Sequence, residues 1–172
     1  MHVTLLSRIS VALLFLFLVF STSTARPGAA RNSWRGITPL RSSAADVAQA
    51  IGIEPDTPDA QVGGPYQVEG GEVTFSYLTP SLAKIYRAPR HMVGKVFTIY
   101  FKPSQPIPQA ELKLTRDFKR CVEEFGKSQY YLVSDAGIAY QFPRNSDQVD
   151  TIIYQPTRAE IRRLAVNAEC VF

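Results

Sequence analysis

The sequence predicts an α+β fold: an antiparallel sheet built from hairpins, with short helices packed on it. Alternating apolar and polar residues flank two turn signals, one at Gly70-Gly71 and one at residues 134–137. Capping patterns at Ser43 and at Thr157 precede two helical stretches. With 172 residues, 45% of them apolar and 20% charged, the chain suits one domain and is too short for two large ones.

The first 25 residues are typical of a cleavable secretory signal peptide. Arg8 ends a short positive start, residues 11–20 are an unbroken apolar run, and Ser23 and Ala25 are the small residues that a signal peptidase reads. The alternative is an uncleaved anchor, but ten apolar residues span only about 15 Å as a helix, half of a ~30 Å hydrocarbon core. We therefore expect cleavage after Ala25, and a secreted or periplasmic protein with no stable membrane span after cleavage.

The rest of the chain is predicted to form one domain. Residues 26–33 contain proline and glycine and nothing to bury, which predicts a disordered leader. Residues 34–172 are expected to form a single α+β domain. Pro103, Pro106 and Pro108 indicate a stiff link within it rather than a domain boundary, because neither half alone has a generous core.

Local signals predict a short helix within residues 42–52. A serine caps it, Asp46 stands at the third helical position if Ser43 is that cap, and Gly52 ends it. An acid in the first turn also interacts favourably with the helix dipole.

A hairpin is predicted next, from residues 66–69 and 72–77. Gly70-Gly71 between them can supply the positive φ angles of a two-residue turn. Counting outward pairs Val68 with Val73 and Tyr66 with Phe75, which places all four side chains on one buried face.

A long basic connection follows the first hairpin at residues 79–94, and residues 81–86 within it can form one helical turn. Residues 96–101 then predict a strand inside the sheet, because apolar side chains occupy both of its faces.

The second half predicts a helix, a hairpin, a strand and a last helix. Apolar residues at helical spacing, followed by Gly126, predict the first helix at residues 115–125. These residues are Leu114, Phe118, Cys121, Val122 and Phe125. The remaining elements are a hairpin of residues 130–133 and 138–142, a strand at 149–155, and a helix from Thr157 to about residue 166.

Charge is distributed in blocks along the chain. Residues 26–41 carry only basic charges, residues 42–83 only acidic ones, and residues 84–110 only basic ones. We expect the blocks to compensate one another in the fold, and a binding face is the alternative. The net charge of +4 is too dilute to predict nucleic-acid binding.

Composition leaves little material for an enzyme site, a metal site or a cofactor, and we expect none of these. His91 is the only histidine after residue 25, no serine lies in a G-x-S-x-G turn, and Cys121, Cys170 and His91 are too scattered for zinc. The sequence therefore predicts a secreted or periplasmic non-enzymatic binding or structural domain. The alternative is a small secreted hydrolase that uses His91 or a carboxylate pair, the nearest pairs being Glu123 with Glu124 and Asp147 with Asp150.

One stretch of the basic connection, residues 84–95, combines cations with an aromatic residue and a methionine. Such a loop is typical of a site for an anionic ligand or for another protein. The partner we expect is an envelope or extracellular protein or an anionic ligand. The candidate binding residues are Lys84, Tyr86, Arg87, Arg90, His91 and Lys95.

Cys121 and Cys170 are the only two cysteines. An even number of cysteines in an oxidising compartment predicts one disulfide between them. Two buried free thiols are the alternative.

Residues 34–43, WRGITPLRSS, together with the Asp46-Val47 and Ile51-Gly52 pairs, resemble the opening of a family of small secreted bacterial proteins of unknown function. Later pieces agree with this resemblance: VFTIYFKP at 96–103, GIAY at 137–140 and IIYQPT at 152–157. The family has no assigned activity, ligand or catalytic residue that could be carried over to this chain.

More loosely, the pattern D-V-x-x-x-I-G at residues 46–52, placed before a hairpin, is similar to the start of the SmpA/OmlA-type outer-membrane assembly lipoproteins. Those proteins are also α+β, and the resemblance implies a place in the cell envelope. This chain departs from them because no cysteine follows its apolar N-terminal run.

Overall fold

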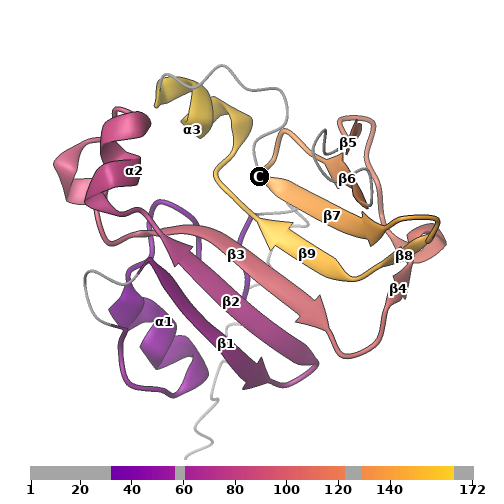
Figure 1. The fold of residues 1–172 in the computed structure, drawn as a ribbon, viewed down its shortest axis with the longest axis horizontal. Helices are drawn as coiled ribbons and strands as arrows, with labels where there is room; N and C mark the ends of the chain where they lie inside the picture. The colour runs from indigo at the N-terminus through magenta and orange to yellow at the C-terminus, as the bar shows by residue number, and fades with distance from the viewer. Residues whose placement is uncertain (1–31, 57–60, 123–128, 165–172) are drawn as a thin grey trace, which may run out of the picture.

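A seven-stranded antiparallel sheet forms the centre of the protein, in a computed structural model that describes residues 32–56, 61–122 and 129–164 (Figure 1). The strand order is β1-β2-β3-β9-β7-β6-β5, and β4 pairs with β8 in a small second sheet. The α-helices are α1 (Ala44–Ile51), α2 (Pro80–Ile85) and α3 (Arg158–Arg163), and the 3₁₀ turns are η1 (Arg90–Met92) and η2 (Gln109–Glu111). The strands are β1 (Val62–Val68), β2 (Gly71–Tyr77), β3 (Val96–Pro103), β4 (Ile107–Pro108), β5 (Lys119–Val122), β6 (Gln129–Val133), β7 (Ile138–Pro143), β8 (Gln148–Val149) and β9 (Thr151–Tyr154).

The predicted α+β class is confirmed at the level of an antiparallel sheet with three short α-helices in the described residues. The fold contains more sheet than the sequence indicated. One reason is that part of the stretch predicted as a helix is the edge strand β5.

Helix α1 begins and ends where the local signals predict. Ser43 Oγ accepts a hydrogen bond from the Asp46 backbone N–H at 3.3 Å, and Asp46 Oδ2 accepts one from the Ser43 N–H at 2.6 Å. Asp46 Oδ2 also accepts a hydrogen bond from the Ser43 hydroxyl. The bonds from the Ser43 N–H and from this hydroxyl hold the pKa of Asp46 below its ordinary value. Gly52 ends the helix with a φ of 72°, in the left-handed region that glycine adopts easily.

The first hairpin, β1 with β2, has a different register from the predicted one. Tyr66 pairs with Val73 rather than with Phe75, and the turn lies one residue earlier. Gly71 belongs to the strand because β3 passes close to it, and a Cβ at Gly71 would lie 2.1 Å from the Lys102 carbonyl oxygen. A shift of two residues leaves each side chain on its own face, so the shared buried face is as predicted.

The pairing of β3 with β9 joins the two halves of the sheet. Ile99 pairs with Tyr154 and Phe101 with Ile152, while β2 occupies the other edge of β3. This confirms that residues 96–101 lie inside the sheet. Because the two strands are antiparallel, the segment before β3 and the segment after β9 lie at the same end of the sheet, and Figure 1 shows α2 and α3 there.

The largest core cluster lies between α1, the 34–37 segment and one face of β1 to β3. Trp34 is buried and its ring contacts Phe75 edge-on, with 5.9 Å between the ring centroids. The buried members of the cluster are Trp34, Ile37, Val47, Val73, Phe75, Tyr77, Val96 and Ile99.

The helix predicted for residues 115–125 is wrong for the part that the structure describes. Residues 119–122 form β5, in which Lys119 pairs with Val133 and Cys121 with Tyr131 of β6. Cys121 is buried, whereas Lys119 and Arg120 are exposed, so only part of this edge strand faces the core. Apolar residues on both faces of a strand can imitate helical spacing, and the backbone partner that decides between the two lies further along the chain. Residues 123–128 lie outside the described residues.

The elements after β5 follow the prediction more closely. Val133 pairs with Ala139 around the predicted turn at 134–137, and β9 falls within the predicted strand. Thr157 caps α3, where its hydroxyl oxygen accepts a hydrogen bond from the Glu160 N–H at 3.2 Å. Residues 165 and 166 of the predicted helix lie outside the described residues.

The folded domain extends two residues further toward the N-terminus than predicted. Asn32 is buried, and its side-chain amide donates a hydrogen bond to the Gln155 carbonyl oxygen at 2.8 Å. Residues 32 and 33 therefore belong to the domain and not to the predicted disordered leader, whose remaining residues 26–31 lie outside the described residues.

Two tyrosine hydroxyls hold the carboxylate of Asp56 against the first hairpin. Tyr66 donates to Oδ1 at 2.6 Å and Tyr77 donates to Oδ2 at 2.7 Å. The carboxylate fills the space beside Gly63, where a Cβ would lie 2.0 Å from Asp56 Oδ2. Burial, followed by the hydrogen bond to Asp56, raises the pKa of Tyr66 to about 12, and the same causes raise the pKa of Tyr77 further.

This arrangement predicts how stability changes in alkali. The unfolded chain loses the Tyr66 proton near pH 10, whereas the folded protein keeps it to about pH 12. The contribution of Tyr66 to stability is therefore complete below pH 10 and falls between about pH 10 and pH 12. Asp56→Asn keeps an acceptor but removes the charge, so the pKa of Tyr66 should fall toward 10 without reaching it, because burial remains.

Ultraviolet absorbance of tyrosinate, recorded during an alkaline titration, measures this pKa, and Tyr66→Phe identifies the signal among the eight tyrosines. Urea unfolding below and above pH 10 should show a smaller alkaline loss of stability in Asp56→Asn than in the parent protein. A Tyr66 that titrates near pH 10 in the parent would contradict this account.

Candidate functional site

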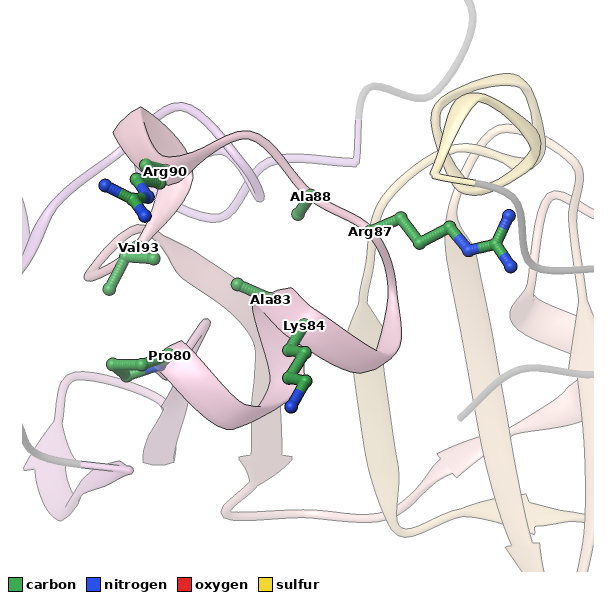
Figure 2. Close-up of a pocket in the computed structure, with 7 residues that line it drawn as sticks. All are labelled: Pro80, Ala83, Lys84, Arg87, Ala88, Arg90 and Val93. Atoms are coloured by element: carbon green, nitrogen blue, oxygen red, sulfur yellow. The ribbon is translucent and has the colours of Figure 1, made fainter.

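The basic connection folds into a pocket of about 660 Å³ at the end of the sheet, which we call the α2–η1 pocket (Figure 2). Four of its seven lining residues are apolar and three are cationic. They are Pro80, Ala83, Ala88 and Val93, and Lys84, Arg87 and Arg90.

Local capping and a tight turn build this pocket. The Thr79 hydroxyl oxygen accepts a hydrogen bond from the Leu82 N–H at 3.2 Å, and Pro80 begins α2. Arg87 then takes a φ of 51°, which turns the chain back so that the Ala88 N–H donates to the Ala83 carbonyl oxygen at 2.8 Å. The turn places Ala83 and Ala88 next to each other in the pocket wall.

The pocket has an apolar centre with cations around it. Figure 2 shows Ala83, Ala88 and Val93 grouped together, with Lys84 on one side of the group and Arg90 on the other. The guanidinium of Arg87 extends away from this group, toward the side on which α3 lies. The three cations therefore surround the pocket and do not converge on one point.

The structure brings together three of the six predicted binding residues, since Lys84, Arg87 and Arg90 line the pocket. Tyr86 is half-buried and packs against the core, because its ring stacks on Phe97 with 5.0 Å between the ring centroids. His91 is exposed on η1.

Lys95 belongs to a different part of the surface from the pocket. It pairs with Ser43 in an isolated β-bridge, and its charge helps to lower the pKa of Asp46 on α1, after the hydrogen bonds from Ser43.

The charge blocks compensate one another less than predicted. Within the described residues, the salt bridges are Arg35 with Glu69 at 3.9 Å, Arg41 with Glu160 at 3.7 Å and Arg158 with Asp135 at 3.2 Å. The first of these joins the first basic block to the acidic block, and Glu69 is 97% exposed in it, so it contributes little to stability. The cations of residues 84–95 have no salt-bridge partner in the described part of the chain.

The fold adds two cations that are not among the predicted binding residues. Ile161 of α3 packs into the same apolar cluster as Ala83 of α2, which places the two helices against one core. Arg162 and Arg163 follow Ile161 in the last turn of α3 and are exposed. No local pattern links them to residue 84, because the link is made by the pairing of β3 with β9.

A second pocket, of about 500 Å³, lies beside α3 and is lined mainly by polar residues. Much of its hydrogen-bonding capacity is used within the protein: Glu160 Oε2 accepts from the Thr157 N–H at 2.9 Å, and Glu160 Oε1 faces Arg41. The lining residues are Asn32, Ser33, Gly36, Thr38, Arg41, Thr157 and Glu160.

The residues of the hydrolase alternative are dispersed. Glu123 and Glu124 lie outside the described residues, Asp147 is exposed, and Asp150 has a buried Oδ1 without a hydrogen-bond partner in the described part of the protein. No group of three His, Cys, Asp or Glu side chains with metal-binding geometry occurs among the described residues. Within the same residues no helix has the length and apolar character needed to cross a membrane.

Comparison of the chain with protein-family models, with curated proteins and with solved structures found no match.

The predicted disulfide remains a prediction, since Cys121 is buried on β5 and Cys170 lies outside the described residues. We expect the exported protein, denatured without reductant, to show no free thiol in a thiol titration and to show two after reduction. A peptide map without reductant should contain Cys121 linked to Cys170. Two free thiols before reduction would favour the alternative of two unpaired cysteines.

Proposed function

We propose that this protein is a secreted or periplasmic, non-enzymatic binding domain that holds an anionic ligand with an apolar part in the α2–η1 pocket. The observation that carries the proposal is the composition of that pocket. An apolar centre has Lys84 and Arg90 on different sides and Arg87 in its lining, and none of the three has a salt-bridge partner in the described residues.

The size and layout of the pocket narrow the class of ligand. A volume of about 660 Å³ lies within the range of pockets that bind small molecules. Lys84 and Arg90 stand on different sides of the apolar centre, so they favour one anionic group at the rim and an apolar body within. A polyphosphate would need cations that converge on it.

The proposed location rests on the N-terminal sequence. Residues 1–25 have the positive start, the apolar run and the small residues of a signal peptide. The resemblance to small secreted bacterial proteins, and the looser one to the SmpA/OmlA type, supports a place in the envelope or outside the cell.

The hydrolase alternative requires His91 or a carboxylate pair to face a nucleophile in a cleft. His91 is exposed on η1, and Asp147 is exposed as well. A binding role uses the residues that the pocket brings together, and it is therefore the function we propose.

The location has a direct test. The exported protein should begin at Arg26, because the small residues Ser23 and Ala25 stand before that bond. Cell fractionation, followed by intact mass measurement of the exported protein, checks this. Replacing Ala25 by a bulky residue should slow cleavage and leave the precursor in the membrane fraction. A protein that retains residues 1–25 in the parent strain would contradict the predicted cleavage.

Anilinonaphthalene sulfonate, an anion with an apolar ring system, is a suitable probe of the pocket. We expect saturable binding, followed by fluorescence, and the double variant Lys84→Gln/Arg90→Gln should weaken it roughly 5- to 10-fold, because two exposed cations are lost. Added salt should reduce binding to the parent protein more than binding to the variant.

The matched control is Lys113→Gln/Arg116→Gln, which removes two exposed cations that do not line the pocket. This control should bind the probe as the parent does. Equal weakening in both double variants would show that the probe responds to net charge alone, and the proposed function would then be wrong. Urea unfolding of each variant confirms that a change in binding is not a loss of folding.

A further inference from the structure

We propose that the end of the sheet formed by α2, η1 and α3 lies against an anionic lipid surface, with Ile85 as its apolar anchor. The proposal rests on the proposed function, because it identifies the partner of the same α2–η1 segment. The anionic groups of that partner are lipid headgroups, and its apolar part is the acyl region directly beneath them.

The exposure of Ile85 is the first observation. Ile85 is 71% exposed, which is more than Val62 at 55% and Leu114 at 36%, the other exposed large apolar residues of the described chain. It is the last residue of α2 and lies next to Lys84, but it does not line the pocket. An apolar side chain in this position adds nothing to the core and is available to a partner.

The second observation is the charge around Ile85. Lys84, Arg87 and Arg90 are exposed, and Arg162 and Arg163 are exposed on α3, which packs on the same apolar cluster as α2. None of the five has a salt-bridge partner in the described residues. His91 of η1 is also exposed.

The acids of the adjoining segments are already occupied. Asp135 forms a salt bridge with Arg158, and Glu160 faces Arg41 while it also caps α3. The five unpaired cations therefore have no acid of their own to neutralise them among the described residues, and this end of the sheet is complementary to a negatively charged surface.

The combination of these two observations favours a lipid surface over a soluble polyanion. A soluble polyanion would neutralise the cations but leave Ile85 in water. Anionic headgroups attract Lys and Arg, while the region beneath them accepts an apolar side chain and the methylene stems of the cations. The cations of this end flank Ile85 on both sides in sequence, with Lys84 before it and Arg87 and Arg90 after it.

Vesicle sedimentation tests the proposal with the exported protein, whose N-terminus is first checked by mass so that the apolar run at 11–20 cannot cause binding. The probe is a vesicle of phosphatidylglycerol and phosphatidylcholine, compared with phosphatidylcholine alone. We expect binding to the anionic vesicle only, and weaker binding as the salt concentration rises.

Two sets of variants separate the anchor from the charge. Ile85→Ser should weaken binding to the anionic vesicle roughly 10-fold, whereas Leu114→Ser, at another exposed apolar residue, should not change it.

The charge variants come second. Lys84→Gln/Arg87→Gln/Arg90→Gln should weaken binding to the anionic vesicle roughly 100-fold, at about 5-fold for each cation. Removing the exposed Lys102, Lys113 and Arg116 in the same way should have a much smaller effect. Arg162→Gln/Arg163→Gln tests the contribution of α3. This double variant should weaken binding to the anionic vesicle roughly 25-fold.

Two results among the vesicle comparisons would overturn the inference, and so would an absence of vesicle binding by the parent. One is equal binding to neutral and anionic vesicles. The other is unchanged vesicle binding in Ile85→Ser, which would leave charge alone and favour a soluble polyanion. Ile85→Ser should still bind anilinonaphthalene sulfonate as the parent does, because Ile85 does not line the pocket. If the parent protein binds no vesicle but still binds anilinonaphthalene sulfonate, the lipid surface is refuted and the proposed function stands.

Discussion

The pairing of β3 with β9 is the interaction on which the rest of the structure depends. Only three residue pairs make it, with Tyr100 opposite Ile153 at its centre, yet it joins β1 to β3 with β5 to β7 in one sheet. An antiparallel pair sets the start of one strand beside the end of the other. It therefore carries α2, which precedes β3, and α3, which follows β9, to the same end of the molecule.

The unpaired cations at that end follow from how the acids are used elsewhere. Asp46 caps α1, Asp56 binds two tyrosine hydroxyls, and Glu160 caps α3 and faces Arg41. Each acid stabilises a local element, because a short hydrogen bond to a carboxylate contributes more to the stability of the fold than an exposed ion pair does. Asp46 and Asp56 of the acidic block are thus engaged in building the fold, while the cations of residues 84–95 form no salt bridge within the described residues.

Most of the elements with local signals could be predicted from the sequence, and so could half of the candidate site. Ser43 and Thr157 cap helices as expected, and residues 134–137 turn the second hairpin. The register of the first hairpin and the helix at 115–125 were wrong because strand partners decide both. Lys102 of β3 passes beside Gly71, and Tyr131 of β6 pairs with Cys121. A basic loop was visible in the sequence, but its pocket depends on the backbone turn at Arg87.

By itself, the sequence determined the helical stretches of α1 and α3 and that β3 lies inside the sheet, because capping residues and a strand with apolar side chains on both faces are local patterns of a few residues. Only the tertiary structure decided that residues 119–122 are a strand, that Tyr86 packs against the core, and that Arg162 and Arg163 share an end with Lys84. The physical reason is the same in each case. A backbone or side-chain partner from a distant part of the chain provides the contact, and no local pattern specifies which partner it will be.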